Sequence, residues 1–81
     1  MFKKIVSVLF FGIILAFAGV DINSASKKEL IKLKGIGPAK AKAIMKYRRK
    51  QKFVKIEDIM NVKGIGPKIF EKIKDDIEVG E

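Results

Sequence analysis

Two stretches of the chain read Lys-Gly-Ile-Gly-Pro, one at residues 34–38 and one at residues 63–67. They are 29 residues apart, and the apolar spacing around them repeats too, since Leu30 matches Ile59 at the same shift. Two copies of one supersecondary unit are therefore present. Two copies are too few for a solenoid but enough to pack on each other.

Each copy has the pattern of a helix, a tight turn and a second helix. In the first copy, Ser26 followed by Glu29 is a capping box, which predicts a short helix through Leu33. In the turn that follows, Gly35 and Gly37 can adopt backbone dihedrals that other residues avoid. The motif therefore indicates a glycine-dependent turn between two short helices.

The second helix of each copy begins with a proline, whose missing N–H costs nothing at the first helical position. After the first turn, Ala41, Ile44 and Met45 form the apolar stripe of such a helix. Phe53 and Val54 connect the copies and are expected to fill the space between them. The four helices are expected at residues 26–33, 38–51, 57–62 and 67–77.

The first 20 residues differ in composition from the rest, because 15 of them are apolar, against 24 of the following 61. Lys3 and Lys4 precede an apolar run, and Ala16 and Ala18 are small residues at the positions that signal peptidase reads. The run at residues 5–20 is shorter than the roughly 20 residues that span a bilayer. This layout is typical of a secretory signal.

These features divide the chain into three parts. A signal peptide is predicted at residues 1–18, with cleavage after Ala18. The alternative is that this segment remains as an N-terminal anchor at the outer face of the cytoplasmic membrane. Residues 19–25 are expected to be a short linker and residues 26–79 the hairpin domain. In either case the domain is expected to work outside the cytoplasm, secreted or in the periplasm.

Charge and residue types narrow the function. After removal of the leader the chain has 16 basic and 9 acidic residues, a balance that points to a polyanion or an anionic membrane. Residues 27–55 have a net charge of +11 and residues 56–81 of −3, so the first copy should dominate the attraction. The absence of Cys and His excludes thiol chemistry, zinc fingers and histidine catalysis. We predict no enzyme activity, because so small a domain has little room for a deep cleft.

The pattern at residues 30–44, Leu-x-x-Leu-x-Gly-Ile-Gly-x-x-x-Ala-x-x-Ile, resembles the helix-hairpin-helix motif of DNA-binding proteins. The second copy fits as well, with Phe70 in place of the alanine. Together with the opening Val-Asp-Ile-Asn-Ser-Ala at residues 20–25 and with Arg48, the paired hairpins look like the ComEA family of competence proteins. We therefore expect an all-α fold with two tandem hairpin units related by a pseudo-twofold axis.

The resemblance also implies a function. It implies a receptor that binds double-stranded DNA without sequence preference and passes it to an uptake channel at the inner membrane during transformation. It implies no cofactor, apart from a monovalent cation that in some helix-hairpin-helix proteins bridges hairpin carbonyls and phosphate. The alternative is an exported helical protein-interaction module that does not bind DNA. The oligomeric state is left open.

The physical chemistry of the turns supports a phosphate site independently. Glycines let the backbone approach a phosphate, and the N–H groups at the start of the following helix point outward with partial positive charge. Phosphate contacts carry no base identity, so sequence preference should be slight. The predicted DNA-binding residues are Lys34, Gly35, Ile36, Gly37, Pro38, Ala39, Lys40, Lys42, Lys63, Gly64, Ile65, Gly66, Pro67 and Lys68.

Several side chains admit two interpretations. Ile36 and Ile65 are expected to fold back into the hairpin core rather than insert between bases. Arg48 either packs its stem on the neighbouring unit or contacts phosphate. Glu57 and Asp58 are expected to complement the dipole at a helix start rather than to hold a metal.

Overall fold

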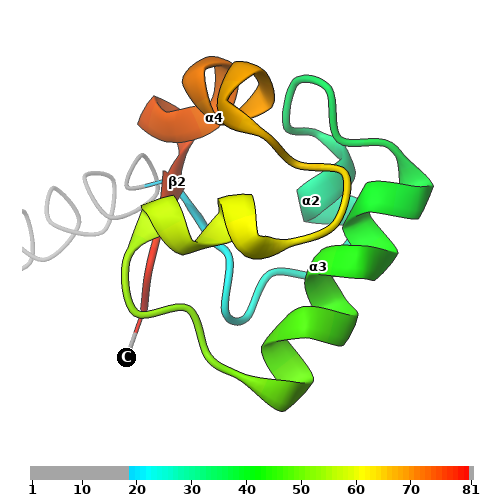
Figure 1. The fold of residues 1–81 in the computed structure, drawn as a ribbon. Coiled ribbons are helices and arrows are strands. Elements are labelled where there is room, and N and C mark those ends of the chain that lie inside the picture. The colour runs from blue at the N-terminus through cyan, green and yellow to red at the C-terminus, as the bar shows by residue number, and fades with distance from the viewer. Residues whose placement is uncertain (1–18, 81) are drawn as a thin grey trace, which may run out of the picture.

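The computed structural model describes residues 19–80 of the chain (Figure 1). The predicted signal peptide or anchor at residues 1–18 lies outside the described residues. Among residues 19–80, every helix is too short or too polar to cross a membrane.

The domain is mostly helical, with one minimal sheet. Its elements in chain order, with η denoting a 3-10 helix, are β1 (Val20–Asp21), α2 (Lys27–Ile31), α3 (Pro38–Lys50), η1 (Ile56–Asn61), α4 (Pro67–Ile73), η2 (Lys74–Asp76) and β2 (Ile77–Glu78). Strands β1 and β2 pair in parallel, with Val20 opposite Ile77. The all-α expectation fits the body of the fold, and the short strand pair is an addition to it.

The helix starts agree with the local signals in the sequence. The Oγ of Ser26 accepts a hydrogen bond of 3.2 Å from the N–H of Glu29, whose carboxylate accepts one of 3.0 Å from the N–H of Ser26. This is the expected capping box. Pro38 and Pro67 stand at the first positions of α3 and α4.

Three helices differ from the sequence prediction, either in where they end or in helix type. Helix α2 ends two residues before Leu33, because the last turn is tightened by hydrogen bonds that span three residues. The predicted helix at residues 57–62 is the 3-10 helix η1, which begins at Ile56. The predicted helix at residues 67–77 is α-helical only to Ile73, because Ile77 belongs to the strand that pairs with β1.

Apolar residues from both copies share one core. Leu30, Ile44, Ile59 and Ile73, which match in pairs at the repeat distance, are all completely buried. Burial of each such side chain stabilises the fold by about 1.5–3 kcal/mol. Met45 is only partly buried, so the inner stripe of α3 is centred on two residues rather than three. The remaining core residues are Ile22, Ala25, Leu33, Ile36, Ala41, Phe53, Val62, Ile65, Phe70 and Ile77.

The segment at residues 19–25 is part of this core, which corrects the expectation of a linker. Ile22 and Ala25 are buried, and the side chain of Asn23 is hydrogen-bonded to the main chain of Phe53. The segment is polar enough to resemble a loop, but its buried Ile22 and Ala25 fill space that the helices leave open. The packed domain therefore includes residues 19–25.

Asp21 ties the beginning of the domain to its end. Its carboxylate accepts hydrogen bonds from the N–H of Gly80 and of Asn23 and from the hydroxyl of Ser24, at 3.0, 2.9 and 3.0 Å. Burial by itself raises the pKa of the Asp21 carboxyl, but these hydrogen bonds outweigh burial and hold its pKa below the ordinary value. We call Asp21, Asn23, Ser24 and Gly80 the clasp.

The connection between the hairpins was predicted correctly at one residue only. Phe53 is buried, and its ring stacks on Tyr47 with the centroids 5.1 Å apart. Val54 is 81% exposed, so the expectation that it fills the space between the copies is wrong. Successive side chains of an extended segment point to opposite sides, and Asp58 holds the Val54 N–H in a hydrogen bond of 2.9 Å.

Candidate nucleic-acid interface

The first glycine of each turn is required by the backbone. Gly35 has a φ of +81° and Gly64 a φ of +93°, in the left-handed region that residues with a Cβ rarely adopt. In both turns the isoleucine N–H donates back to the carbonyl three residues earlier, at 3.1 Å in the first and 3.0 Å in the second. The two turns therefore share one local geometry.

The second glycine has a role that differs from our expectation. Gly37 and Gly66 have extended backbones that any residue can adopt, with φ of −94° and −107°. A Cβ added at either position would meet no atom of the described domain within 4 Å. These glycines are therefore not needed for the fold. They leave the surface of the turn without a side chain at this point.

The helices that follow the turns begin with N–H groups that have no acceptor among residues 19–80. Their N-cap residues are glycines, which have no side chain to accept a hydrogen bond. Among residues 19–80, the donors without an acceptor are the N–H groups of Ala39 and Lys40 in α3 and of Lys68 and Ile69 in α4. Ile69 was missing from the sequence prediction, although it lies 29 residues after Lys40 and could have been found by that shift.

Each turn lies against the second helix of the other copy. A Cβ at Gly35 would stand 3.7 Å from Cγ1 of Ile69 on α4, and a Cβ at Gly64 would stand 3.7 Å from Cε of Lys40 on α3. The contact is reciprocal, because the two pairs match at the repeat distance. Both turns lie on the side of the domain away from the strand pair (Figure 1).

The structure leaves most of the predicted lysines accessible. Lys40 is half-buried because its stem lies over the second turn. The exposed predicted residues are Lys34, Gly35, Pro38, Ala39, Lys42, Lys63, Gly64, Pro67 and Lys68. Ile36 and Ile65 are only 3% and 2% exposed, so their side chains fold back as expected and only their main chain can contribute to binding.

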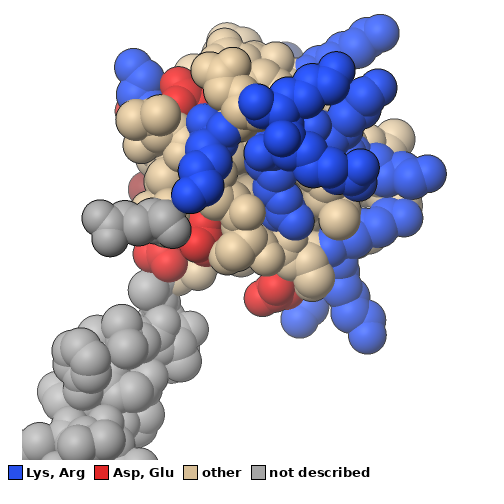
Figure 2. All heavy atoms as spheres, turned by 90° about the horizontal axis from the view of Figure 1, so that it is seen from below, with Lys and Arg blue, Asp and Glu red and all other residues tan. Residues whose placement is uncertain are grey.

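On the face seen in Figure 2, Lys and Arg side chains gather on one side. The residues at 19–80 contain a single salt bridge, of 3.1 Å between Lys74 and Glu71, and its hydrogen bond raises the pKa of Lys74. That pair lies outside the basic stretch at residues 27–55. The exposed cations on α3 are Lys42, Lys46, Arg49 and Lys50. Their charge therefore remains available to a polyanion.

Arg48 and Asp58 of η1 have structural partners. The guanidinium of Arg48 donates a hydrogen bond of 3.2 Å to the carbonyl of Ile22, so it braces the N-terminal segment. The carboxylate of Asp58 accepts hydrogen bonds from the N–H groups of Val54 and Lys55, at 2.9 and 3.2 Å. These two bonds, that from Val54 first, lower the pKa of Asp58, which fits the expected role at a helix start.

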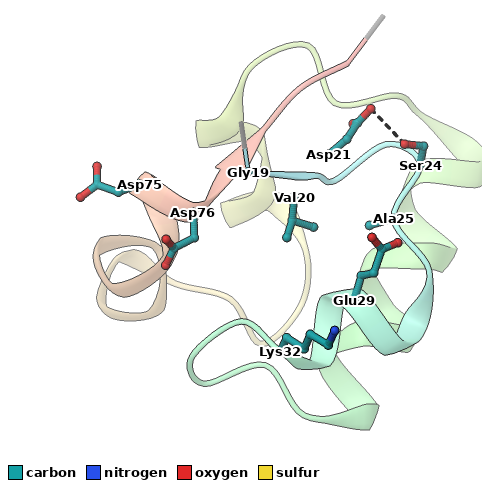
Figure 3. Close-up of a pocket in the computed structure, with 9 residues that line it drawn as sticks. All are labelled: Gly19, Val20, Asp21, Ser24, Ala25, Glu29, Lys32, Asp75 and Asp76. Carbon is teal, nitrogen blue, oxygen red and sulfur yellow. Dashed lines mark hydrogen bonds between the residues drawn. The ribbon is translucent and has the colours of Figure 1, made fainter. Parts of the chain in front are cut away.

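A hollow of about 530 Å³ lies at the opposite end, beside the strand pair (Figure 3). Its ionisable lining residues are Asp21, Glu29, Asp75 and Asp76, with Lys32 as the cation among them. Excess negative charge repels phosphate. This hollow is therefore not part of the nucleic-acid interface.

Residues 19–80 contain no group of three or more carboxylate, His or Cys side chains arranged to hold a metal ion. A monovalent cation at the hairpins would instead need turn carbonyls. The carbonyls of Leu33 and Val62 each accept one hydrogen bond from a turn isoleucine, and a carbonyl has two lone pairs. The turns thus keep acceptor capacity that fits such a cation.

The profile of the helix-hairpin-helix motif matches residues 16–78. The chain is 52% identical over 61 residues to ComE operon protein 1 of Bacillus subtilis (strain 168), covering 74% of this chain and 30% of that protein. It is 43% identical over 60 residues to an uncharacterized protein of Haemophilus influenzae, with 72% and 54% covered.

A third relative is S1 RNA-binding domain-containing protein 1 of Homo sapiens, 35% identical over 68 residues, which are 83% of this chain and 7% of that protein. The chain therefore spans well under two thirds of the length of each of these relatives. The matched region nevertheless contains both turns and their helices. The chain belongs to the helix-hairpin-helix family and is a ComEA-like protein.

Proposed function

We propose that this protein binds double-stranded DNA through its phosphates, without sequence preference, with the two hairpins acting as one tandem unit related by a pseudo-twofold axis. The observation that carries the proposal is the reciprocal contact of the turns with Ile69 and Lys40. This contact brings two open glycines and two uncapped helix starts to the same side of the domain. Such a pair can grip a duplex at two phosphate positions.

The electrostatics of the helix starts favour an anion there. The first turns of α3 and α4 contain no acidic residue, and no side chain caps them. A helix N-terminus has a partial positive charge of roughly half a unit, which acidic residues or bound anions normally complement. Lys34 and Lys63, which precede the turns, add full charges. A phosphate therefore meets both hydrogen-bond donors and cations.

The biological role that fits this binding is DNA reception in competence. The likeness to ComE operon protein 1 supports this role, and the leader at residues 1–18 supports export of the domain. The protein would then work, without enzyme activity, in the periplasm or as a secreted protein, and would pass DNA to an uptake channel in the inner membrane. Retention of the leader would instead give a receptor anchored at the outer face of that membrane.

Fluorescence anisotropy with residues 19–81 and labelled duplexes of unrelated sequence tests the binding. We expect binding to every duplex, with affinities that agree within about tenfold, because phosphate contacts are shared by all sequences. Absence of binding at low salt would overturn the proposal and favour the alternative of a protein-interaction module. A preference well above tenfold would reveal base readout in the grooves.

A further inference from the structure

A groove of about 390 Å³ lies between α3 and η1, beside the second hairpin. Its floor is made by buried and half-buried side chains, those of Ala43, Tyr47 and Val62. Its rim is made by exposed cations, Lys46, Lys50 and Lys63. An apolar floor inside a ring of ammonium groups suits a ligand with both an apolar face and negative charge.

We propose that this groove binds unpaired nucleotides of a DNA strand, with a base on the apolar floor and phosphates on the three lysines. The inference rests on the proposed function, because it places these nucleotides where a strand leaves the duplex held by the hairpins. It adds a second binding mode, for single-stranded DNA, to the phosphate grip of the turns.

The apolar floor of the groove should bind single-stranded DNA and double-stranded DNA differently. A duplex offers phosphates and sugars to a protein surface and keeps the faces of its bases stacked inside. An unpaired base exposes its π face, which gains free energy on an apolar or aromatic surface whatever the base. The ammonium group of lysine is a compact point charge that binds phosphate. The groove therefore complements an unpaired nucleotide better than a paired one.

The position of the groove joins it to the hairpin site. Lys63 lines the groove and also precedes Gly64 in the second turn, so a strand that leaves the duplex at this turn enters the groove directly. Lys46 and Lys50 are one helical turn apart, about 6 Å along α3. They are neighbours on one face of the helix and extend the line of positive charge from the turn.

Tyr47, on the floor of the groove, is held in place and has a polar edge. The ring of Tyr47 stacks on the buried Phe53, with an interplanar angle of 18°. Its hydroxyl accepts a hydrogen bond of 3.4 Å from Nδ2 of Asn61, so the hydroxyl proton remains available to donate. A base on the floor would thus find a donor at its edge as well as an apolar surface.

An acidic peptide with an apolar side chain has similar chemistry. The shared Lys63 favours DNA, because this residue joins the groove to a turn whose helix start is open to phosphate. The experiment must therefore separate three outcomes: unpaired DNA in the groove, an acidic peptide in the groove, and no ligand there.

The test compares a blunt duplex with the same duplex carrying a single-stranded overhang of about six thymidines, close to the smaller site sizes of single-strand binders. Anisotropy with residues 19–81 should show affinity for the overhang duplex about fivefold or more above that for the blunt one. Two variants should lose this ratio: Lys46→Gln with Lys50→Gln, and Ala43→Leu, which fills the groove without changing charge. The matched control, Lys27→Gln with Lys28→Gln on α2, should keep it.

The ratio of the affinity for the overhang duplex to that for the blunt duplex distinguishes this inference from the proposed function. Equal affinity of the wild-type protein for both duplexes would overturn this inference and leave the proposed function intact. Failure to bind either duplex would overturn the proposed function as well. Displacement of the overhang by a peptide of alternating Glu and Leu, at lower concentration than by free oligothymidine, would assign the groove to a protein partner. If the Ala43→Leu variant kept this ratio, and circular dichroism showed unchanged helix content, the inference would also be overturned.

Discussion

The side chain of Asn23 and the main chain of Phe53 are joined by two hydrogen bonds of 2.9 Å each. Nδ2 of Asn23 donates to the carbonyl of Phe53, and the N–H of Phe53 donates to Oδ1 of Asn23. One amide side chain thus satisfies both main-chain groups of a residue 30 positions later. The connection between the hairpins is held by the segment that precedes them.

Replacement Asn23→Ala should therefore destabilise the fold. It leaves the partly buried N–H and carbonyl of Phe53 without their partner, at a cost of about 1–3 kcal/mol. Urea denaturation followed by circular dichroism measures this loss. Ser24→Ala is the control, because it removes one exposed hydroxyl contact and should cost less than about 1 kcal/mol. Equal losses in the two variants would contradict the bracing role of Asn23.

The two glycines of a turn should respond differently to alanine. Gly35→Ala forces a Cβ into the left-handed region and should lower the free energy of unfolding by about 1–2 kcal/mol. Gly37→Ala has an ordinary backbone and open space around its Cβ, so stability should stay within about 0.5 kcal/mol. Its DNA affinity should nevertheless fall, because the methyl group stands where a phosphate would approach.

The hairpins should also differ from each other. Gly37→Ala should reduce DNA affinity more than Gly66→Ala, because residues 27–55 have a net charge of +11 and residues 56–81 of −3. Anisotropy on one duplex compares the two variants, and denaturation confirms that both are folded. Equal losses of affinity would refute the ranking by charge.

Binding should weaken steeply with salt. If the hairpins and their lysines neutralise about 4–6 phosphates, the logarithm of affinity should fall against the logarithm of salt with a slope of about −4 to −5. Lys34→Gln should reduce the magnitude of the slope by about 1, as expected for one lost phosphate contact. A slope near zero would contradict binding through phosphates.

Stability should depend on the charge of Asp21 in acid. Its pKa is lower in the folded than in the unfolded chain, so its contribution is complete above the unfolded value of about 3.9 and is lost as the pH falls through the folded value. Asp21→Asn should accordingly be less stable than wild type at pH 6, and the difference should shrink at pH 3. Asp75→Asn, at an exposed carboxylate, serves as the control. A constant difference across this range would argue against ionised Asp21 as the clasp acceptor.

The leader should be absent from the mature protein. Residues 19–25 pack into the domain, so a retained leader would leave no spacer between the domain and the membrane. A bound duplex would then lie within a few Debye lengths of an anionic surface, each about 8 Å at physiological salt. Intact-mass analysis of protein from its native host should find a chain that starts at Gly19. Recovery with membranes of a chain that retains Met1 would establish the anchored receptor instead.

The sequence predicted features that depend on a few neighbouring residues. The capping box at Ser26, the helix starts at Pro38 and Pro67 and the burial of Ile36 all follow from local spacing. Contacts between distant segments could not be predicted in this way. The pairing of Val20 with Ile77 and of Asp21 with Glu78 joins two-residue segments from opposite ends of the described domain, so no local pattern predicts it.

The candidate site likewise combines local features that the sequence predicted with long-range features that it did not. Two Gly-Ile-Gly turns were evident in the sequence, but only the backbone shows that Gly35 is needed for its φ, whereas Gly37 has an ordinary backbone and open space around it. The groove was not predicted at all, because Lys46 and Lys63 come from different copies and meet only after these pack. A search for lysines around a half-buried aromatic in the folded domain would have found it.

The hydrogen bond between Asp21 and Gly80 joins positions 59 residues apart, and this separation has a consequence for the timing of folding. A chain that is synthesised or threaded through a translocation pore N-terminus first presents Asp21 early and Gly80 last. The carboxylate of Asp21 must therefore wait for the N–H of Gly80. The clasp can close only after residue 80 has emerged, so this part of the fold forms late in synthesis.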